Sequence, residues 1–248
     1  LTLSSNSDFS FILDKKFKFK NLKLKSSLFL ESAEYYFEAK KLKKILPNFD
    51  NKLIIKNNKI NLEYDKNLNI SGSGEFYGSE HKENISYDIK RLKDNLNIKI
   101  GLSLNNTPIK FSLLDFHKDK STEGELSLNF NKYKKKLSIE SLSLISKKNE
   151  FTLSELILSE NFKIIDVKKI KLSYKDQNNI ANNLILTKKK NFFQIEGNHF
   201  SLSSIIKNIL TEDSEGDQRL FDKQKRTFKV KFDENYIDDD HIIYDLSG

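Results

Sequence analysis

Apolar and polar residues alternate along most of this chain. The alternation is clear in Phe17-Lys18-Phe19-Lys20, in residues 96–104 and again in residues 170–174. Because successive side chains of a β-strand point to opposite faces of a sheet, a period of two predicts strands with one apolar and one polar face. The polar positions are mostly Lys, Asn and Ser, which suit contact with water. The pattern therefore predicts a mostly β protein.

Short polar segments separate the alternating runs, as in residues 93–95, 134–135 and 147–149. Such joints are typical of hairpins, and Asn is expected at most turn positions because it tolerates a left-handed backbone. We therefore expect a meander between residues 53 and 196. Its predicted strands are 53–56, 59–64, 68–77, 83–91, 96–104, 109–117, 123–133, 136–146, 150–158, 162–167, 170–175, 182–188 and 191–196.

The segment before this meander has two interpretations. A first β block is expected over residues 9–30. Residues 33–46 could then form an amphipathic helix that ends before Pro47, which cannot continue a helix. The alternative is a strand through Tyr35-Tyr36-Phe37 followed by a short turn of helix. We prefer the second interpretation because aromatic residues favour strands.

The chain divides at a charged stretch near its end. We expect an antiparallel β array over residues 1–210, with a short helix near 201–210, and a flexible charged linker over 211–226. Residues 227–248 then begin a further, truncated β segment, with strands at 227–233 and 241–246. There is no Met in the sequence, so we expect the chain to be either a processed product or an internal piece of a longer protein, and we prefer the second.

An apolar face of this size must be hidden from water. Three closures are open: a sandwich of two sheets, a closed barrel, or a long curled sheet covered by helices or occupied by an apolar ligand. The fold class predicted is a long antiparallel meander that forms a curled, elongated sheet or groove, with one or two short helices. The alternation assigns a set of inward-facing positions, here called the inner-face positions, although a one-residue bulge would reverse part of it. They are Ile98, Ile100, Leu102, Leu104, Leu126, Leu128, Phe130, Leu142 and Leu144.

Composition and charge narrow the possible partners. Hydrophobic residues make up 37% and charged residues 31% of the chain, which is lean for a thick core but enough for a one-sided sheet. The net charge is +8, yet the lysines are spread along solvent faces and Arg occurs only at positions 91, 219 and 226. Specific nucleic-acid binding favours a clustered basic patch with Arg, so no nucleic-acid partner is expected.

The residue types that carry enzymatic chemistry lack the spacing of known sites. Each of the four His is isolated in sequence, there is no Cys, and G-x-S-x-G and H-E-x-x-H are absent. Asp238-Asp239-Asp240 lacks the Gly and Glu of a calcium loop. Ser71-Gly72-Ser73-Gly74 lacks the Lys of a phosphate loop and predicts a bulge or a close backbone approach. We therefore expect no catalytic residue, no metal ligand, no cofactor and no enzyme.

Residues 193–206 run from a strand through Gly197 and an alternating step into a short helix. This arrangement, with Lys- and Asn-spaced strands and short turns over most of the chain, resembles the AsmA-like superfamily of bacterial envelope proteins, especially its large YhdP-type members. Ser201 stands where relatives typically have Asp before the helix. The resemblance implies a periplasmic body, an inner-membrane anchor outside this segment, and a long β groove that shields acyl chains during phospholipid transport between membranes. It implies no catalytic residues.

Three functional hypotheses follow. In the first, the chain is part of a periplasmic AsmA-like scaffold whose concave apolar face binds or conducts phospholipid or another acyl lipid, with the inner-face positions facing the lipid. In the second, it is a structural or adhesin-like β array that binds proteins through its edges and has a filled core between two sheets. The third, nucleic-acid binding, predicts a strongly salt-dependent affinity for DNA.

Overall fold

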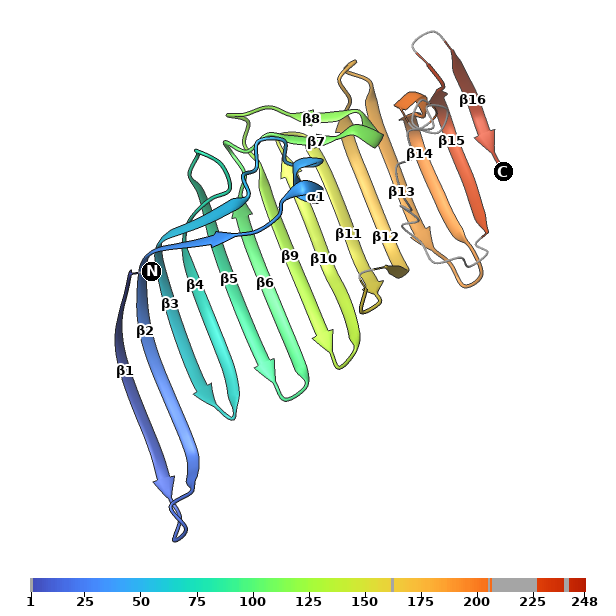
Figure 1. Ribbon diagram of the computed structural model, residues 1–248. Coiled ribbons are helices and arrows are strands. Elements are labelled where there is room, and N and C mark those ends of the chain that lie inside the picture. The colour runs from blue at the N-terminus through green and yellow to red at the C-terminus, as the bar shows by residue number, and fades with distance from the viewer. Residues whose placement is uncertain (1, 162, 205, 207–226, 239–240) are drawn as a thin grey trace.

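The computed structural model describes residues 2–161, 163–204, 206, 227–238 and 241–248, and its main feature is one open 14-stranded sheet (Figure 1). Neighbouring strands follow chain order and pair antiparallel, except that β14 and β15 are parallel. The strands of this sheet are β1 Thr2–Leu13, β2 Phe19–Tyr36, β3 Lys52–Asp65, β4 Asn67–Tyr77, β5 Glu83–Leu92, β6 Asn95–Ser103, β9 Glu125–Tyr133, β10 Lys136–Ser146, β11 Asn149–Leu158, β12 Ile164–Lys175, β13 Ala181–Lys188, β14 Phe193–Ser201, β15 Phe228–Tyr236 and β16 Ile242–Ser247. The predicted mostly β fold is confirmed, and the sheet does not close into a barrel.

Four short elements lie outside the main sheet and cross its upper end in Figure 1. They are α1 Lys40–Lys43, β7 Ile109–Phe111, the 3-10 turn η1 Ser112–Leu114 and β8 Phe116–Lys118. The strand predicted over 109–117 is therefore wrong, because η1 and the left-handed Asp115 (φ 49°) fold the segment into a two-stranded hairpin of its own. The preferred interpretation of residues 33–46 is confirmed, since β2 runs to Tyr36 and only a short helix follows.

Two predicted hairpin joints lie within single strands. Residues 53–56 and 59–64 belong to one strand, β3, whose register shifts between Lys56 and Lys59. Asn57 there has a φ of 50°, and the buried Asn58 accepts a hydrogen bond from the Tyr87 hydroxyl at 2.8 Å. The predicted strands 162–167 and 170–175 likewise merge into β12, for which residues from 164 onward are paired. In β3 the bulge absorbs an extra polar residue without turning the chain, whereas β12 pairs with β11 in unbroken register across residues 167–169.

The glycines of residues 71–74 lie inside β4. A Cβ on Gly74 would stand 2.5 Å from Asn58 Nδ2, and one on Gly72 would stand 2.5 Å from the Tyr87 hydroxyl. The close approach predicted for this segment is therefore present. The expectation that Asn fills most turn positions is wrong at the tight turns, where Lys66, Lys93, Lys134 and Lys147 have positive φ.

Strands are present at both ends of the chain, as the sequence predicts. The block expected at residues 9–30 is a long hairpin of β1 and β2. Near the other end, the amide of Ile206 donates to the Leu202 carbonyl at 2.8 Å, which begins the predicted helical turn. The rest of that helix and the linker expected at 211–226 lie outside the described residues. Residues 228–247 add two strands to the same sheet.

Candidate ligand-binding face

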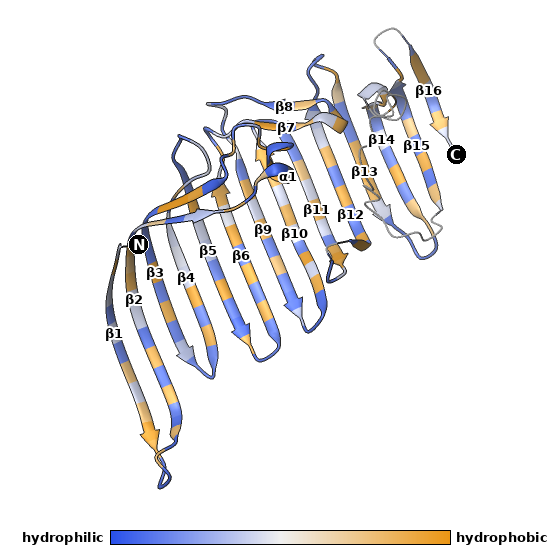
Figure 2. Cartoon of the chain, viewed as in Figure 1, coloured by the Kyte–Doolittle hydropathy of each residue, from blue (hydrophilic) through white to orange (hydrophobic). Residues whose placement is uncertain are grey.

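The inner-face positions lie on one side of the sheet. Register pairs Ile98 with Phe130, and it pairs Leu128 with both Ile100 and Leu142. Leu126 in turn stands beside both Leu102 and Leu144. Directly paired residues share a face, so the alternation grouped them correctly. Figure 2 shows the same alternation as bands of apolar and polar residues along the strands.

A bulge in β10 leaves this grouping intact. Glu140 has no partner on β9, where the register shifts between Ile139 and Ser141. Its carboxylate accepts hydrogen bonds from the side-chain amides of Asn129, at 2.6 Å, and Asn131, at 3.2 Å. Leu142 and Leu144 both follow the bulge in the chain, so their side chains still point to the same face of the sheet.

Cross-strand pairing joins the apolar side chains into rows that run perpendicular to the strands. The first row is Ile85, Leu102, Leu126, Leu144, Phe151, Leu172 and Leu184. The second row is Tyr87, Ile100, Leu128, Leu142, Leu153, Ile170, Leu186, Ile195 and Val230. The apolar face is therefore continuous across most of the sheet.

Residues 37–51 and 105–118, here called the roof, cover this face at one end only (Figure 1). Phe116 lies at the centre of the roof contact, 1% exposed, with its ring 4.7 Å from that of Phe151 and 5.9 Å from that of Tyr174. Phe111 adds an edge contact with Phe151 at 5.4 Å. Burial raises the pKa of the Tyr174 hydroxyl above its ordinary value, as expected for a phenol in this aromatic cluster.

Backbone hydrogen bonds connect the two roof segments to each other and connect the roof to the turn after β12. The amide of Lys110 donates to the Ile45 carbonyl at 2.8 Å, which joins the β7–β8 hairpin to the α1 segment. The amide of Gln177, after β12, donates to the Asp115 carbonyl at 3.1 Å. These two hydrogen bonds therefore hold the roof segments together and hold the β7–β8 hairpin near the turn after β12.

A buried carboxylate binds the segment by which the chain leaves β6 and enters the roof. Glu83 lies at the start of β5 and is 3% exposed. Its carboxylate accepts hydrogen bonds from the backbone amides of Asn105 (3.0 Å) and Asn106 (2.6 Å) and from the Thr107 hydroxyl (2.9 Å). Lys118 is also buried, and its ammonium donates to the Thr107 carbonyl at 2.9 Å. Burial lowers the pKa of Lys118, and the negative charge of Glu83 offsets part of this lowering.

An apolar cavity of about 620 Å³ lies between the roof and the sheet. Apart from Thr107, its lining is aliphatic and aromatic: Leu42, Ile45, Leu46, Phe49, Leu53, Ile55, Phe76, Ile85, Ile100, Leu102, Leu104, Ile109, Phe111, Leu126, Leu142, Leu144 and Phe151. The volume is within the range of small-molecule sites, which are mostly apolar. The lining offers a ligand no charged partner, so the cavity suits a hydrocarbon group.

The predicted positions divide between the cavity and the open face. Ile100, Leu102, Leu104, Leu126, Leu142 and Leu144 line the cavity. Ile98, Leu128 and Phe130 lie on the same face outside it and are half-buried. Sequence reasoning missed the sheet residues Phe76 and Phe151, and it missed the roof residues of the lining, among them Ile109 and Phe111. Nothing in the alternation distinguishes a roof strand from a sheet strand.

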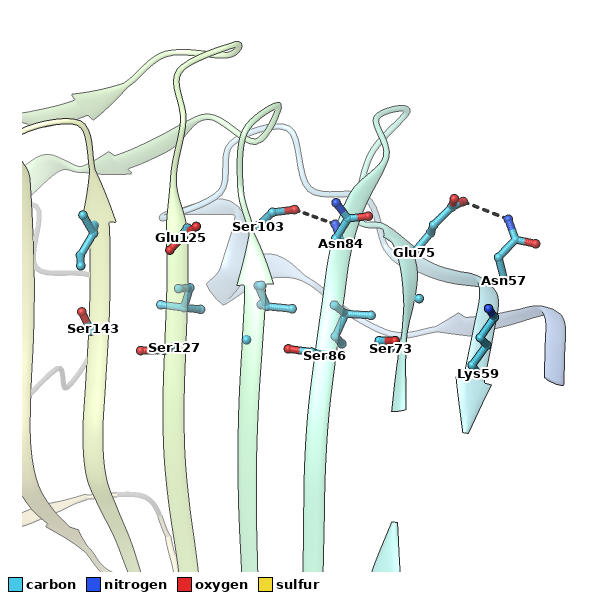
Figure 3. Close-up of a pocket in the computed structure, with 16 residues that line it drawn as sticks. Asn57, Lys59, Ser73, Glu75, Asn84, Ser86, Ser103, Glu125, Ser127 and Ser143 are labelled. Atoms are coloured by element: carbon cyan, nitrogen blue, oxygen red, sulfur yellow. Dashed lines mark hydrogen bonds between the residues drawn. The ribbon is translucent and has the colours of Figure 1, made fainter. Parts of the chain in front are cut away.

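The opposite face is polar and shallowly hollowed. Figure 3 shows Ser73, Ser86, Ser127 and Ser143 on neighbouring strands with their side chains on this face, in a hollow of about 690 Å³. Asn57 donates to Glu75 at 3.2 Å, and the amide of Asn84 donates to the Ser103 hydroxyl at 2.7 Å. Most of the residues that line this hollow are polar, and the exposed Ile145 also lies in it.

Candidate chemical groups remain scattered. Within the described part of the chain, no three His, Asp or Glu side chains come together as a metal site. His199 Nδ1 lies 2.7 Å from Glu234 and His241 Nδ1 lies 2.7 Å from Asp238, while Asp239 and Asp240 lie outside the described residues. None of the described helices has the length and apolar character that a membrane span requires.

No protein-family model, no curated protein and no solved structure matches this chain. The resemblance to AsmA-like proteins therefore stays a prediction, and functional inference depends on the geometry of the apolar face.

Proposed function

We propose that this chain is a non-enzymatic lipid-binding scaffold whose apolar face holds an acyl chain. The observation that carries the proposal is the apolar cavity of about 620 Å³ between the roof and the sheet. Its floor continues, through the second row, into an apolar face that the roof leaves uncovered. A linear hydrocarbon could lie along these rows, with one part in the cavity and the rest on the open face.

The energetics favour such an occupant. Removing apolar surface from water contributes about 25 cal/mol per Å² to the free energy of binding. An acyl chain that covers half-exposed Leu and Ile side chains would therefore form a favourable complex with the sheet. A phospholipid would add a polar headgroup that remains in water. We propose a periplasmic site, between inner and outer membranes, only by extension of the AsmA-like resemblance, with the inner-membrane anchor outside this segment.

The second candidate, a protein-binding β array, has one specific observation in its favour. Within the described residues, β1 and β16 each pair with a single neighbour, so both edges of the sheet offer unpaired backbone groups. However, that candidate expects a filled core between two sheets, whereas the β7–β8 hairpin is the one further sheet described. We therefore favour the lipid proposal.

A pair of adjacent substitutions tests the proposal. Leu142 lines the cavity, and its neighbour Ser143 lies on the polar face. Leu142→Glu would place a carboxylate on the floor, where burial without a partner is unfavourable, so we expect the lipid that co-purifies with the chain to fall about tenfold. Ser143→Glu should keep the wild-type amount. Extraction and mass spectrometry measure the lipid, and circular dichroism checks the fold of both variants.

The proposal fails if no acyl lipid co-purifies with the wild-type chain, or if both Glu variants retain lipid equally.

A further inference from the structure

The tip of the β1–β2 hairpin exposes an unusual concentration of apolar side chains. Phe17 is 84% exposed, Phe9 68% and Phe19 67%. Phe11, Ile12 and Leu13 are also exposed. Exposed apolar groups gathered in one place indicate an interaction surface rather than ordinary scatter.

The tip is also basic. Residues 9–20 contain Lys15, Lys16, Lys18 and Lys20, against the single acidic residue Asp14. Lys20 lies 3.4 Å from the Asp14 carboxylate, so that pair is close to neutral. Lys15, Lys16 and Lys18 remain exposed beside Phe17. Lysines that alternate with aromatic residues on one hairpin favour a partner with an anionic surface above an apolar interior.

The turn holds this arrangement in place. The Asp14 carboxylate accepts hydrogen bonds from the amides of Lys16 (2.8 Å) and Lys18 (3.0 Å), and the Phe17 amide donates to the Asp14 carbonyl at 2.9 Å. Phe17 therefore adopts a positive φ of 57° at the apex. The backbone of the turn is therefore ordered before binding, and mainly side-chain freedom would be lost when the tip binds.

The position of the tip in the molecule adds a second observation. It lies at the end of the sheet opposite the roof (Figure 1). Phe9 pairs with Leu24, which pairs with Tyr64, and the rings of Phe11 and Phe19 lie 4.8 Å apart. The apolar face of the sheet thus continues to the tip.

We propose that the β1–β2 tip docks on an anionic phospholipid bilayer, with Phe17 and Phe19 in the interface and Lys15, Lys16 and Lys18 among the headgroups. The charge complementarity between these lysines and anionic lipid selects this partner. The inference goes beyond the proposed function, because membrane docking does not require an acyl chain on the inner face.

Co-sedimentation of the full chain with vesicles tests the inference. We expect binding to phosphatidylcholine vesicles that contain phosphatidylglycerol, and much weaker binding to pure phosphatidylcholine or at high salt. Phe17→Ser should weaken binding about tenfold. Lys15→Gln with Lys16→Gln should weaken it about 25-fold, since each lysine near an anionic surface contributes about fivefold.

Matched controls lie at the roof end of the molecule. Leu113→Ser removes an exposed apolar side chain from η1, and Lys147→Gln with Lys148→Gln removes two exposed charges from the β10–β11 turn. Both should bind vesicles like the wild type. Leu142→Glu should lose lipid yet still bind vesicles, which separates this test from that of the proposed function.

Equal vesicle binding by the tip variants and their controls would overturn the inference. It would also be overturned if the wild-type chain did not bind anionic vesicles. It would also be overturned if Phe17→Ser abolished a dimer in sedimentation velocity without changing vesicle binding, because the tip would then bind a second copy of the chain.

Discussion

Replacing Phe116 by Ala is expected to cost about 3–5 kcal/mol in the free energy that holds the roof on the sheet. The ring is 1% exposed and contacts Phe111, Phe151 and Tyr174. Its removal leaves a void among rigid aromatic neighbours, which cannot collapse onto an Ala side chain. Because the main sheet has its own cross-strand pairing, the loss should be concentrated in the roof.

Hydrogen exchange measures this effect residue by residue. In Phe116→Ala, amides of β7, β8 and the 37–51 segment should exchange far faster than in the wild type, while amides of β9 and β10 remain protected. Leu113→Ala is the matched control: it truncates a roof side chain that is 51% exposed, and it should change stability by no more than about 0.5 kcal/mol. Unchanged roof exchange in Phe116→Ala would contradict the roof as described.

Removing the Glu83 carboxylate is expected to be similarly costly, at about 3–5 kcal/mol for Glu83→Ala. The amides of Asn105 and Asn106 and the Thr107 hydroxyl would lose their acceptor at the point where the chain leaves β6 for the roof. Lys118 would also lose the nearby negative charge that favours its protonated form.

Three variants give this second prediction its controls. Glu83→Gln keeps the size and one acceptor oxygen, so its loss should be smaller. Glu80→Ala removes an exposed carboxylate from the preceding turn and should be close to neutral. Adding Lys118→Met to Glu83→Ala should recover part of the loss. Denaturant unfolding measures all four chains, and a Glu83→Ala chain as stable as the wild type would contradict the assigned role.

The face assignment could be predicted from sequence because it depends on local geometry alone. Side chains two residues apart in a strand share a face whatever the rest of the fold does, so Ile98, Ile100 and Leu102 were grouped correctly. The same reasoning failed at residues 56–59, where a polar run that is typical of a hairpin turn is a bulge inside β3. Whether such a run turns or bulges depends on the partners of the strand, here Asn58 with Tyr87 and Gly74.

The roof could not be predicted, for a related reason. Residues 109–117 show the apolar spacing of a sheet strand, and their separate fold depends on long-range packing of Ile109 and Phe116 against the apolar face. Glu83 carries no local signal either, since a carboxylate at the start of a strand is ordinarily exposed. The parallel pairing of β14 with β15 joins segments far apart in sequence, which strand periodicity does not encode.

Photocrosslinking tests the central claim most directly. A photoreactive amino acid at Leu128 would face the apolar side of the sheet, and one at the adjacent Ser127 would face the polar side. We predict crosslinks to lipid acyl chains from position 128 and none above background from position 127. Equal crosslinking from both positions, or none from position 128 in the presence of lipid, would contradict the proposal that this face binds acyl chains.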